Sequence, residues 1–311
     1  MGLATREAYG EILKELGEKN KNIVVLDADL SKSTKTAVFA KAFPERFFNV
    51  GIAEQNLMGI GAGLAAGGKV PFVSTFAMFA AGRAFEQIRN SICYPKLNVK
   101  IAATHAGLTV GEDGASHQSI EDISLMRSIP NMTVIVPADA EETRKAITFA
   151  ADYDGPVYIR LGRMAVPDLF TSDYQFEHGK AVQIVNGSDV TIIATGIMVG
   201  SAKQAAEKLK EAGISARVLN IHTIKPIDQK AVVKAAADTG AIVTCEEHSI
   251  IGGLGSAVAE VLVENYPVVM ERVGVKDTFG ESGTPSTLLV KYHLTADDIV
   301  TAAKKAISRK K

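Results

Sequence analysis

The stretch TVIVPADAEETRKAITFAADYDGPVYI, residues 133–159, contains the pattern that decides the fold. Two apolar runs, Thr133–Val136 and Pro156–Ile159, are typical of buried strands. The segment Asp139–Ala151 between them has the 3.6-residue period of an amphipathic helix. Strands that are apolar on both faces indicate a parallel sheet covered by helices on both sides. The stretch therefore predicts one strand–helix–strand unit of an α/β fold.

The same alternation runs through most of the chain. Before residue 164, further strands are expected at 23–26, 47–50, 70–73 and 99–103, and a helix at 85–92. Residues 164–179 lose the period and carry Pro167, Asp168 and Gly179, which predicts a linker. After it, strands are expected at 190–194, 216–219, 241–245 and 268–272, and helices at 201–212, 229–237, 255–264 and from Thr295. We predict two α/β domains, residues 1–165 and 180–311, each a mostly parallel sheet with helices on both faces, joined by a linker at 166–179.

Composition excludes several classes of protein. The 311 residues are 47% hydrophobic and 22% charged, which is typical of a folded chain of two domains at roughly 150 residues each. The formal net charge of −1 gives no electrostatic reason to expect a nucleic acid or an anionic membrane as a partner. The first residues lack the apolar run of a signal peptide, and no apolar stretch is long enough for a bilayer. Cys93 and Cys245 have no metal-ligand spacing, so we expect reduced thiols and a cytoplasmic protein.

Two glycine-rich segments suggest phosphate binding. Gly61-Ala-Gly63-Leu-Ala-Ala66 matches the dinucleotide pattern G-x-G-x-x-A, but the pattern requires a turn directly after a strand. Here the glycines fall inside a helix expected from about Ala53, which favours close helix packing over NAD binding. Gly252-Gly253-Leu-Gly255 does open a helix after a strand, so it is either an anion site or a packing turn.

Three residues around the second predicted strand–helix–strand unit are candidates for chemistry. Glu54 is the one carboxylate at the start of a long apolar helix, where the simpler interpretation is an acid that offsets the helix dipole. Phe76 and Phe79 follow the next strand in a chain with only 6% aromatic residues. Phenylalanines at this spacing are usually part of the core.

A glycine-punctuated loop between residues 104 and 119 is a stronger candidate site. It carries His105, Glu112, Asp113 and His117, and it has too little apolar material to be core. Two of the chain's six histidines in one short loop favour a functional site. A metal site is the alternative, but no set of ligands here has compact zinc spacing.

Three motifs together resemble the transketolase family of thiamine-diphosphate enzymes. They are G-I-A-E-Q at 51–55, T-F-x-x-F at 75–79 and H-x-G-x-x-x-G-E-D-G-x-x-H-Q at 105–118. The match is to the family's pyrimidine-binding and C-terminal domains, and it covers nearly the whole chain. Cys245-Glu-Glu-His248 with Gly252-Gly253 is also similar to the family's C-terminal domain.

The resemblance also shows what this sequence lacks. The family's diphosphate-binding domain carries G-D-G followed by an Asn, which hold Mg²⁺ and the diphosphate. The nearest match here, Gly111-Glu-Asp-Gly114, belongs to the glycine-punctuated loop. The resemblance therefore implies the C-terminal subunit of a split transketolase. An N-terminal partner subunit would hold the diphosphate and Mg²⁺, in an α₂β₂ assembly, and no metal ligand is expected in this chain.

The resemblance implies that the cofactor, thiamine diphosphate, is held by four residues of this chain. Glu54 would share a proton with N1′ of the pyrimidine, which makes the cofactor's own 4′-amino group a base. An apolar setting would favour that shared proton. Phe76 and Phe79 would stack on the aminopyrimidine, and Asp29 would lie near the thiazolium.

The implied reaction moves a two-carbon glycolaldehyde unit from a ketose phosphate to an aldose phosphate. By resemblance, His105, Asp113 and His117 would bind the sugar hydroxyls and the developing oxyanion, with the two histidines and Glu54 as catalytic residues. The phosphate would be bound by the remaining candidates, and arginine suits this because its fork binds phosphate oxygens in pairs. These candidates are Arg6, Ser33 and Arg163.

Departures from the family keep alternatives open. Many members have a third aromatic residue where Gly82 stands, and His105-Ala-Gly resembles the Arg-Ala-Gly of deoxyxylulose-phosphate synthase. The loop length and the second phenylalanine favour transketolase over that enzyme. The beta subunits of 2-oxo acid dehydrogenases share the architecture but not usually this loop. Alternatives of another class are a non-catalytic scaffold protein that keeps the fold and a nicotinamide dehydrogenase, although we expect no NAD binding.

Overall fold

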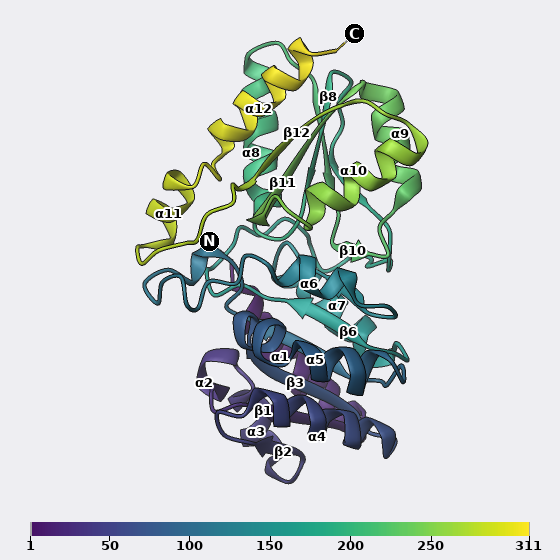
Figure 1. The fold of residues 1–311 in the computed structure, drawn as a ribbon, viewed down its shortest axis with the longest axis vertical. Helices are drawn as coiled ribbons and strands as arrows, with labels where there is room; N and C mark the ends of the chain where they lie inside the picture. Colours follow the sequence, from purple (N-terminus) through teal and green to yellow (C-terminus); the bar gives the residue numbers. More distant parts are fainter. Residues whose placement is uncertain (1, 311) are drawn as a thin grey trace.

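The chain forms two mostly parallel sheets, in a computed structural model that describes residues 2–310 (Figure 1). The first sheet has the strand order β10-β5-β6-β4-β3-β1-β2, and the second has the order β12-β11-β8-β9-β7. Helices cover both faces of each sheet. The predicted α/β class, with parallel sheets between layers of helices, is confirmed.

Six strands of the first sheet run parallel, and the seventh is antiparallel. The strands are β1 (Ile23–Asp27), β2 (Phe47–Asn49), β3 (Val70–Phe76), β4 (Lys100–Thr104), β5 (Thr133–Ile135), β6 (Val157–Arg160) and β10 (Thr223–Lys225). Every residue of β1, β4 and β6 is buried, as expected for strands covered on both faces. Because β1, β3, β4 and β6 are parallel, their carboxyl ends meet at one edge of the sheet.

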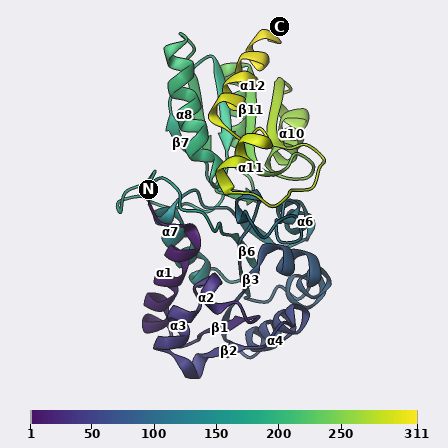
Figure 2. The ribbon, with the colours of Figure 1, turned by 90° about the vertical axis from the view of Figure 1, so that its left-hand side faces the viewer.

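Alternate residues of these strands pack on two different layers of helices. The helices are α1 (Thr5–Lys19), α2 (Ser31–Thr34), α3 (Ala37–Ala42), α4 (Glu54–Ala66), α5 (Phe85–Gln87), α6 (Asp122–Ser128) and α7 (Ala140–Asp152). In β1, Ile23 and Val25 face the layer of α1, α3 and α7, whereas Val24 and Leu26 face α4 and α6. Figure 2 shows α1 and α3 on one side of the sheet and α4 on the other.

The helix expected at 85–92 is wrong in type. The segment consists of the short α5 between two π-helical turns, at Phe79–Arg83 and Ile88–Cys93. The buried residues Ala80, Ala84, Ile88 and Ile92 recur every four residues, and the wider π turns keep them on one face. Such turns are rare and are often found at functional sites.

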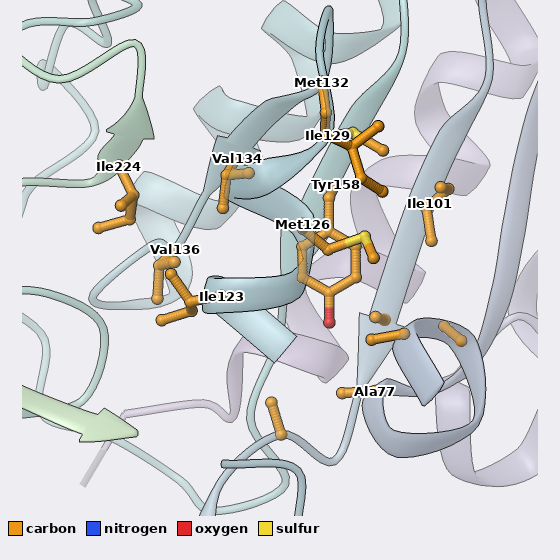
Figure 3. Packing of buried hydrophobic residues seen from close by; sticks show 14 of the residues in the cluster. Ala77, Ile101, Ile123, Met126, Ile129, Met132, Val134, Val136, Tyr158 and Ile224 are labelled. Carbon is orange, nitrogen blue, oxygen red and sulfur yellow. The ribbon is translucent and has the colours of Figure 1, made fainter. Parts of the chain in front are cut away.

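In the core beneath α6, a buried tyrosine of the sheet packs against the helix. Tyr158 of β6 is fully buried and lies among Ile101 of β4 and Ile123 and Met126 of α6 (Figure 3). Its hydroxyl donates a hydrogen bond of 2.8 Å to Asp122 Oδ2. The polar end of the ring is therefore satisfied inside an apolar cluster, as buried tyrosines require.

The second sheet carries its own two layers of helices. Its strands are β7 (Val182–Val185), β8 (Val190–Ala194), β9 (Ala216–Asn220), β11 (Ala241–Ser249) and β12 (Val269–Val275), of which only β7 is antiparallel. Its helices are α8 (Met198–Glu211), α9 (Gln229–Thr239), α10 (Leu254–Asn265), α11 (Pro285–Lys291) and α12 (Ala296–Ser308). In Figure 1, α8 and α12 cover one face, and α9 and α10 the other. Thr295 caps α12 in a capping box with Asp298, as the sequence suggests.

One strand from the second half of the chain belongs to the first sheet and so links the two sheets. β10 follows β9 of the second sheet along the chain, but it pairs antiparallel with β5 of the first. Apolar residues of α9 and α10 also belong to the same hydrophobic cluster as α4 and β3. The division into domains at residues 165 and 180 therefore stays a prediction. None of the helices in residues 2–310 combines the length and the apolar character needed to cross a bilayer.

Candidate functional site

Most of the predicted site residues lie at the carboxyl-terminal edge of the first sheet. Phe76 ends β3, His105 follows β4 directly, Arg163 follows β6 and Asp29 follows β1. Glu54 begins α4, which comes after the neighbouring strand β2. Ligands of parallel α/β sheets usually bind at this edge, because the loops that leave the strands converge there.

Glu54 is buried and faces an arginine that the sequence analysis did not select. The residue is 4% exposed, and its Oε1 accepts a hydrogen bond of 3.0 Å from Nη1 of Arg83. The Arg83 guanidinium is half-exposed and lies over the ring of Phe79, with 4.2 Å between its central carbon and the ring centroid. Glu54 and Arg83 line a pocket of about 370 Å³ together with Ile52, Ala53, Gln55 and Asn56. The expectation of a purely apolar setting for Glu54 is therefore wrong.

Four rings form an aromatic cluster beside this pocket. Phe76 and Phe79 are nearly parallel, with centroids 5.8 Å apart. The His105 ring stacks on Phe76 at 3.8 Å, and the His117 ring meets Phe79 edge-on at 5.2 Å. One face of Phe76 is thus covered by His105, whereas the Phe79 ring lies under Arg83, which lines the pocket of Glu54.

His105 is a neutral imidazole held between two fixed partners. Its Nε2 lies 3.1 Å from Nη1 of Arg6, and its Nδ1 lies 2.9 Å from Oγ1 of Thr104. A guanidinium can only donate, so Nε2 accepts and the proton is on Nδ1. Burial lowers the pKa of His105 to about 3, assisted by the charges of Arg6, Arg163, His117 and Lys35.

Three cationic side chains, those of Arg6, Arg163 and Lys35, lie near enough to His105 to lower its pKa. Arg6 also donates to the backbone carbonyl of Ser33 at 2.9 Å, while its buried Nε has no partner. Burial is the main reason that the pKa of Arg6 is lowered. The structure therefore brings the candidates Arg6, Ser33 and His105 together, and it adds Lys35, which stands two residues after Ser33 in the sequence.

Arg163 is tied to the loop of residues 105–118, which we call the histidine loop. Its Nη1 donates to the Val110 carbonyl and to Glu112 Oε2 at 3.2 Å, and it lies 3.9 Å from Asp113 Oδ2. Asp113 is exposed and His117 is half-buried. The structure thus places Arg163, Asp113 and His117 around one loop that opens toward solvent.

Asp29 lies beside the turn that leads to Glu54. It is exposed, and it accepts a hydrogen bond from Asn49 Nδ2 at 3.1 Å. Asn49 Oδ1 also accepts from the amide of Gly51. The buried Asp27 was not selected from the sequence, although it accepts from Leu30 N, Thr34 Oγ1 and Thr36 Oγ1 and so fixes the segment of Ser33.

The expectation that the histidine loop cannot be core is wrong for its first half. Residues 105–111 are all buried, and Leu108 and Val110 are fully enclosed. Leu108 belongs to the hydrophobic cluster of α8 and α12, so residues of the second sheet supply the apolar cover that the loop lacks. Glu247 of β11 also contacts the loop, through the amide of Thr109, and it was not selected from the sequence, since no local pattern links it to the loop.

The two glycine-rich segments have different explanations. Gly61 and Gly63 lie inside α4, as predicted, and a Cβ at Gly61 would be 2.8 Å from Val73 Cγ1. Gly63 faces open space, so close packing explains only the first of the two. At the second segment, the amides of Leu254 and Gly255 at the start of α10 donate to the buried carboxylate of Glu246 at 2.7 and 2.8 Å. The anion at this helix N-terminus is therefore the chain's own glutamate.

Within residues 2–310, no group of three or more His, Cys, Asp or Glu side chains is arranged to hold a metal ion. The site consists instead of one buried carboxylate beside a pocket, an aromatic cluster, and a cationic cluster around a neutral histidine. Such a set can hold a flat aromatic ring with an N–H group together with an anionic, hydroxyl-bearing molecule.

Two family models match most of the chain. The pyrimidine binding domain of transketolase matches residues 1–168, and the transketolase C-terminal domain matches residues 179–299. A putative transketolase C-terminal section of Methanocaldococcus jannaschii is 55% identical over 94% of this chain and 93% of its own length. A 6-deoxy-6-sulfo-D-fructose transketolase subunit of Clostridium sp. is 47% identical over 98% of this chain and 95% of its own length. Transketolase of Mus musculus is 38% identical over 99% of this chain but only 49% of its own length.

Solved structures show the same likeness. A split-gene transketolase, in an inactive beta4 tetramer, is 64% identical and superposes with a TM-score of 0.94 over the whole of both chains. Transketolase from Leishmania mexicana is 26% identical, with a TM-score of 0.85 over 99% of this chain and 46% of its own.

Proposed function

Because this chain belongs to the transketolase family, we propose that it is the C-terminal subunit of a two-subunit transketolase. The complete enzyme transfers a two-carbon glycolaldehyde unit from a ketose phosphate to an aldose phosphate. Membership in the family implies a requirement for thiamine diphosphate. In this proposal an N-terminal partner subunit holds the diphosphate and Mg²⁺, and this chain holds the pyrimidine and the sugar.

The lengths of the relatives support a divided enzyme. Relatives named as sections or subunits are matched over 93% and 95% of their own length, whereas the whole transketolase of Mus musculus is matched over 49%. The 64% identical split-gene protein is described as inactive in its beta4 form. We propose that this chain by itself self-associates without activity, and that it becomes active in an α₂β₂ complex.

The contacts of Arg83 test whether the site fits an aminopyrimidine. The Arg83 guanidinium is flat, cationic and a hydrogen-bond donor, like a protonated aminopyrimidine. It stacks on Phe79 and donates to Glu54 at 3.0 Å, which are the two contacts that the pyrimidine requires. The residues present therefore fit the group, provided that Arg83 moves aside when the ring enters.

Thiamine diphosphate, when bound, supplies the nucleophilic carbon that ketol transfer requires. Glu54 Oε1 would hold the proton shared with N1′ of the pyrimidine. Phe79, supported by Phe76, would hold the ring and exclude water. Asp29 would lie on the thiazolium side, beside the turn that carries Glu54.

The cationic cluster around His105 is suited to a sugar phosphate. Arg6, with Lys35 nearby, would bind the phosphate oxygens, and the Ser33 hydroxyl would donate to them. Neutral His105 can donate and accept, which suits a hydroxyl. Asp113 and His117 would bind further hydroxyls from the open side of the loop, where Arg163 completes the positive field.

One observation carries this proposal: a series of ring contacts joins the pocket of Glu54 to the cationic cluster around His105. Arg83 of the pocket lies over Phe79, Phe79 stacks on Phe76, and Phe76 stacks on His105 beside Arg6. A cofactor ring and a sugar phosphate would thus be held side by side. The test is to mix the chain with a partner subunit that carries G-D-G, thiamine diphosphate and Mg²⁺. Ketol transfer from xylulose 5-phosphate to ribose 5-phosphate is expected from the mixture and from neither chain alone. No transfer to any sugar phosphate would refute the proposal.

The natural sugar is a separate question. Relatives are named for 6-deoxy-6-sulfo-D-fructose and for apulose 4-phosphate, and Arg6 with Lys35 can bind a sulfonate as readily as a phosphate. A panel of these donors and pentose phosphates, compared by kcat/KM, identifies the preferred sugar. Cys93 and Cys245 are free thiols, which supports the further proposal that the protein acts in the cytoplasm.

A further inference from the structure

The histidine loop owes its buried position to the C-terminal part of the chain. Leu108, Thr109 and Val110 form a 3₁₀ turn that is fully enclosed. Leu108 packs in the cluster that contains Val275 and Leu294, and α11 packs on the same turn. In Figure 1, α11 lies below α12, near the level at which the two sheets meet. The loop that carries His105, Asp113 and His117 is thus covered by residues more than 130 positions later in the chain.

Glu247 makes the central polar contact in this cover. It is buried in β11, and its Oε1 accepts a hydrogen bond of 2.6 Å from the amide of Thr109. Gly107 has a φ of +82°, and a Cβ at this position would overlap the Glu247 carboxylate. The start of the loop therefore has the shape that this carboxylate requires, and a larger residue at 107 would be excluded by both backbone conformation and space.

The second half of the loop meets another C-terminal segment, residues 281–285. Gly114 has a φ of +76°, and a Cβ there would be 2.6 Å from Ser282 Oγ. The buried Gln118, next to His117, donates to the carbonyl of Glu281 at 2.9 Å. The same amide group donates to the carbonyls of Leu108 and Gly111, so Gln118 ties the buried first half of the loop to residue 118.

Arg160 connects Glu247 to the base of the loop. It lies at the end of β6, and its Nε donates to Asp122 Oδ2 at 2.9 Å. Its Nη2 donates to the carbonyls of Ser119 and Glu247 at 3.2 and 2.9 Å, and its Nη1 lies 4.0 Å from Glu247 Oε2. Burial raises the pKa of Glu247 to about 7, opposed mainly by the charge of Arg160. Burying a carboxyl group costs desolvation free energy that an apolar side chain would not cost. Here the carboxyl group binds a backbone amide, which an apolar side chain could not do.

We propose that Glu247 is a positioning residue for the sugar: by holding the Thr109 amide beside Arg160, it sets the loop geometry in which His105, Asp113 and His117 meet the substrate. The C-terminal domain thereby shapes substrate binding without touching the substrate. This inference rests on the proposed function of the loop.

The chain offers a matched control in the neighbouring residue. Glu246 lies in the same strand and is equally buried, and its carboxylate also accepts from backbone amides. Those amides belong to Leu254 and Gly255 of α10, not to the histidine loop. Glu246→Ala should therefore destabilise the fold much as Glu247→Ala does while leaving the loop in place.

Hydrogen exchange tests the contact itself. In the wild-type chain and in the complex with its partner, the Thr109 amide should exchange slowly. Glu247→Ala should speed its exchange by about tenfold or more, because a buried acceptor is lost. Glu246→Ala should leave it unchanged, and Glu247→Gln should retain most of the protection because its carbonyl oxygen still accepts. Fast exchange of Thr109 in the wild type would overturn the inference.

Kinetics of the reconstituted complex test the positioning. Glu247→Ala should raise the KM for xylulose 5-phosphate by about tenfold at an unchanged Kd for thiamine diphosphate, and Glu247→Gln should recover most of the loss. Glu246→Ala should change neither quantity by more than about twofold. Equal KM values in Glu247→Ala and Glu246→Ala, in a complex whose wild type is active, would overturn this inference alone. A wild-type complex without ketol transfer would refute the proposed function and the inference with it.

Discussion

The two sheets of this molecule each place a buried glutamate at the start of a helix, and they use it in opposite ways. Glu246 of the second sheet is saturated by the amides of Leu254 and Gly255, so the N-terminus of α10 is closed. Within residues 2–310, the Glu54 side chain at the start of α4 has no backbone partner, and its one partner is the half-exposed Arg83, which lines the same pocket. The same architecture thus yields a structural carboxylate in one half and a carboxylate available to a ligand in the other.

The difference comes from the groups that surround each helix start. After Gly252 and Gly253 the chain brings its own amides onto Glu246, which offsets the cost of burying the carboxylate. Around Glu54, the π turn of residues 79–83 sets Arg83 over Phe79 and leaves the carboxylate reachable. A buried acid that is paired with a half-exposed side chain and not with backbone amides is a functional candidate, and this criterion separates Glu54 from Glu246.

The largest effect is expected from Glu54→Gln. The variant keeps the shape of the side chain but cannot share a proton in the same way, so ketol transfer by the reconstituted complex should fall by about 10³-fold. The thermal midpoint of the chain should change little. Steady-state kinetics and calorimetry measure the two effects, with the exposed Glu18→Gln as control. Turnover near the wild-type level would remove Glu54 from its proposed role.

Glu246→Ala should lower the stability of the fold and leave turnover nearly unchanged, which is the reverse of the effect of Glu54→Gln. Two buried amides at the start of α10 lose their acceptor, which should lower the free energy of unfolding by about 2 kcal/mol. The kcat of the complex should stay within about twofold of the wild type. Urea unfolding of the isolated chain measures the loss of stability. A stable Glu246→Ala variant with impaired turnover would mean that the two carboxylates do not differ as described.

His105 makes the free energy of unfolding depend on pH. Because its pKa in the folded chain is lowered to about 3, the imidazole stays neutral there while the unfolded chain takes up a proton below about pH 6.5. The contribution of His105 to the free energy of unfolding is therefore complete above pH 6.5. As the pH falls from 6.5 toward 3, this contribution decreases by about 1.4 kcal/mol for each pH unit.

The variant His105→Asn should lose this part of the acid sensitivity. Asparagine also tolerates the positive φ of 56° at this position. His293→Asn is a matched control, since His293 has a φ of 58° but lies exposed in the second half of the chain. Urea unfolding between pH 7.5 and 5 compares the variants. Parallel pH profiles of the wild type and His105→Asn would contradict the buried neutral state.

The smallest effect is expected from Arg83→Leu. The variant removes the cation that occupies the ring face of Phe79, so thiamine diphosphate should bind the complex about threefold more tightly. The effect should be this small because the Arg83 end of the ion pair is half-exposed and screened by solvent. Isothermal titration calorimetry measures the change, and Arg89→Leu serves as control. Weaker binding would show that Arg83 belongs to the cofactor site and is not displaced from it.

Local patterns predicted much of the fold. Strands β1 to β6 follow from apolar runs, and helix α12 follows from the amphipathic pattern that begins near Thr295. Helix α1 was not predicted, since it begins after Ala4 without a side-chain cap. Strand β10 was not predicted in the first sheet, because its pairing with β5 joins residues about 90 positions apart. Such pairings depend on tertiary contacts that no local pattern contains.

The candidate site divides in the same way. Residues within recognisable motifs, such as Glu54, His105 and Arg6, could be selected from the sequence, and the structure brings His105 and Arg6 to one contact. Two residues that contact the site, Arg83 and Glu247, could not be selected in this way. Arg83 reaches Glu54 across 29 positions through a π turn, and Glu247 reaches Thr109 across 138. Arg83 only follows the motif that ends at Phe79. Glu247 lies within the segment Cys245–His248 that resembles the family, but nothing in that segment indicated its contact with the loop.

The exchange of the thiazolium C2 proton for deuterium, followed by NMR in the complex with thiamine diphosphate and Mg²⁺, tests the contrast between Glu54 and Glu246 most directly. The wild-type complex and Glu246→Ala should exchange this proton much faster than free thiamine diphosphate. Glu54→Gln should fall toward the rate of the free cofactor. Fast exchange in Glu54→Gln, or slow exchange in the wild type, would contradict the account that Glu54 is the carboxylate that serves the cofactor.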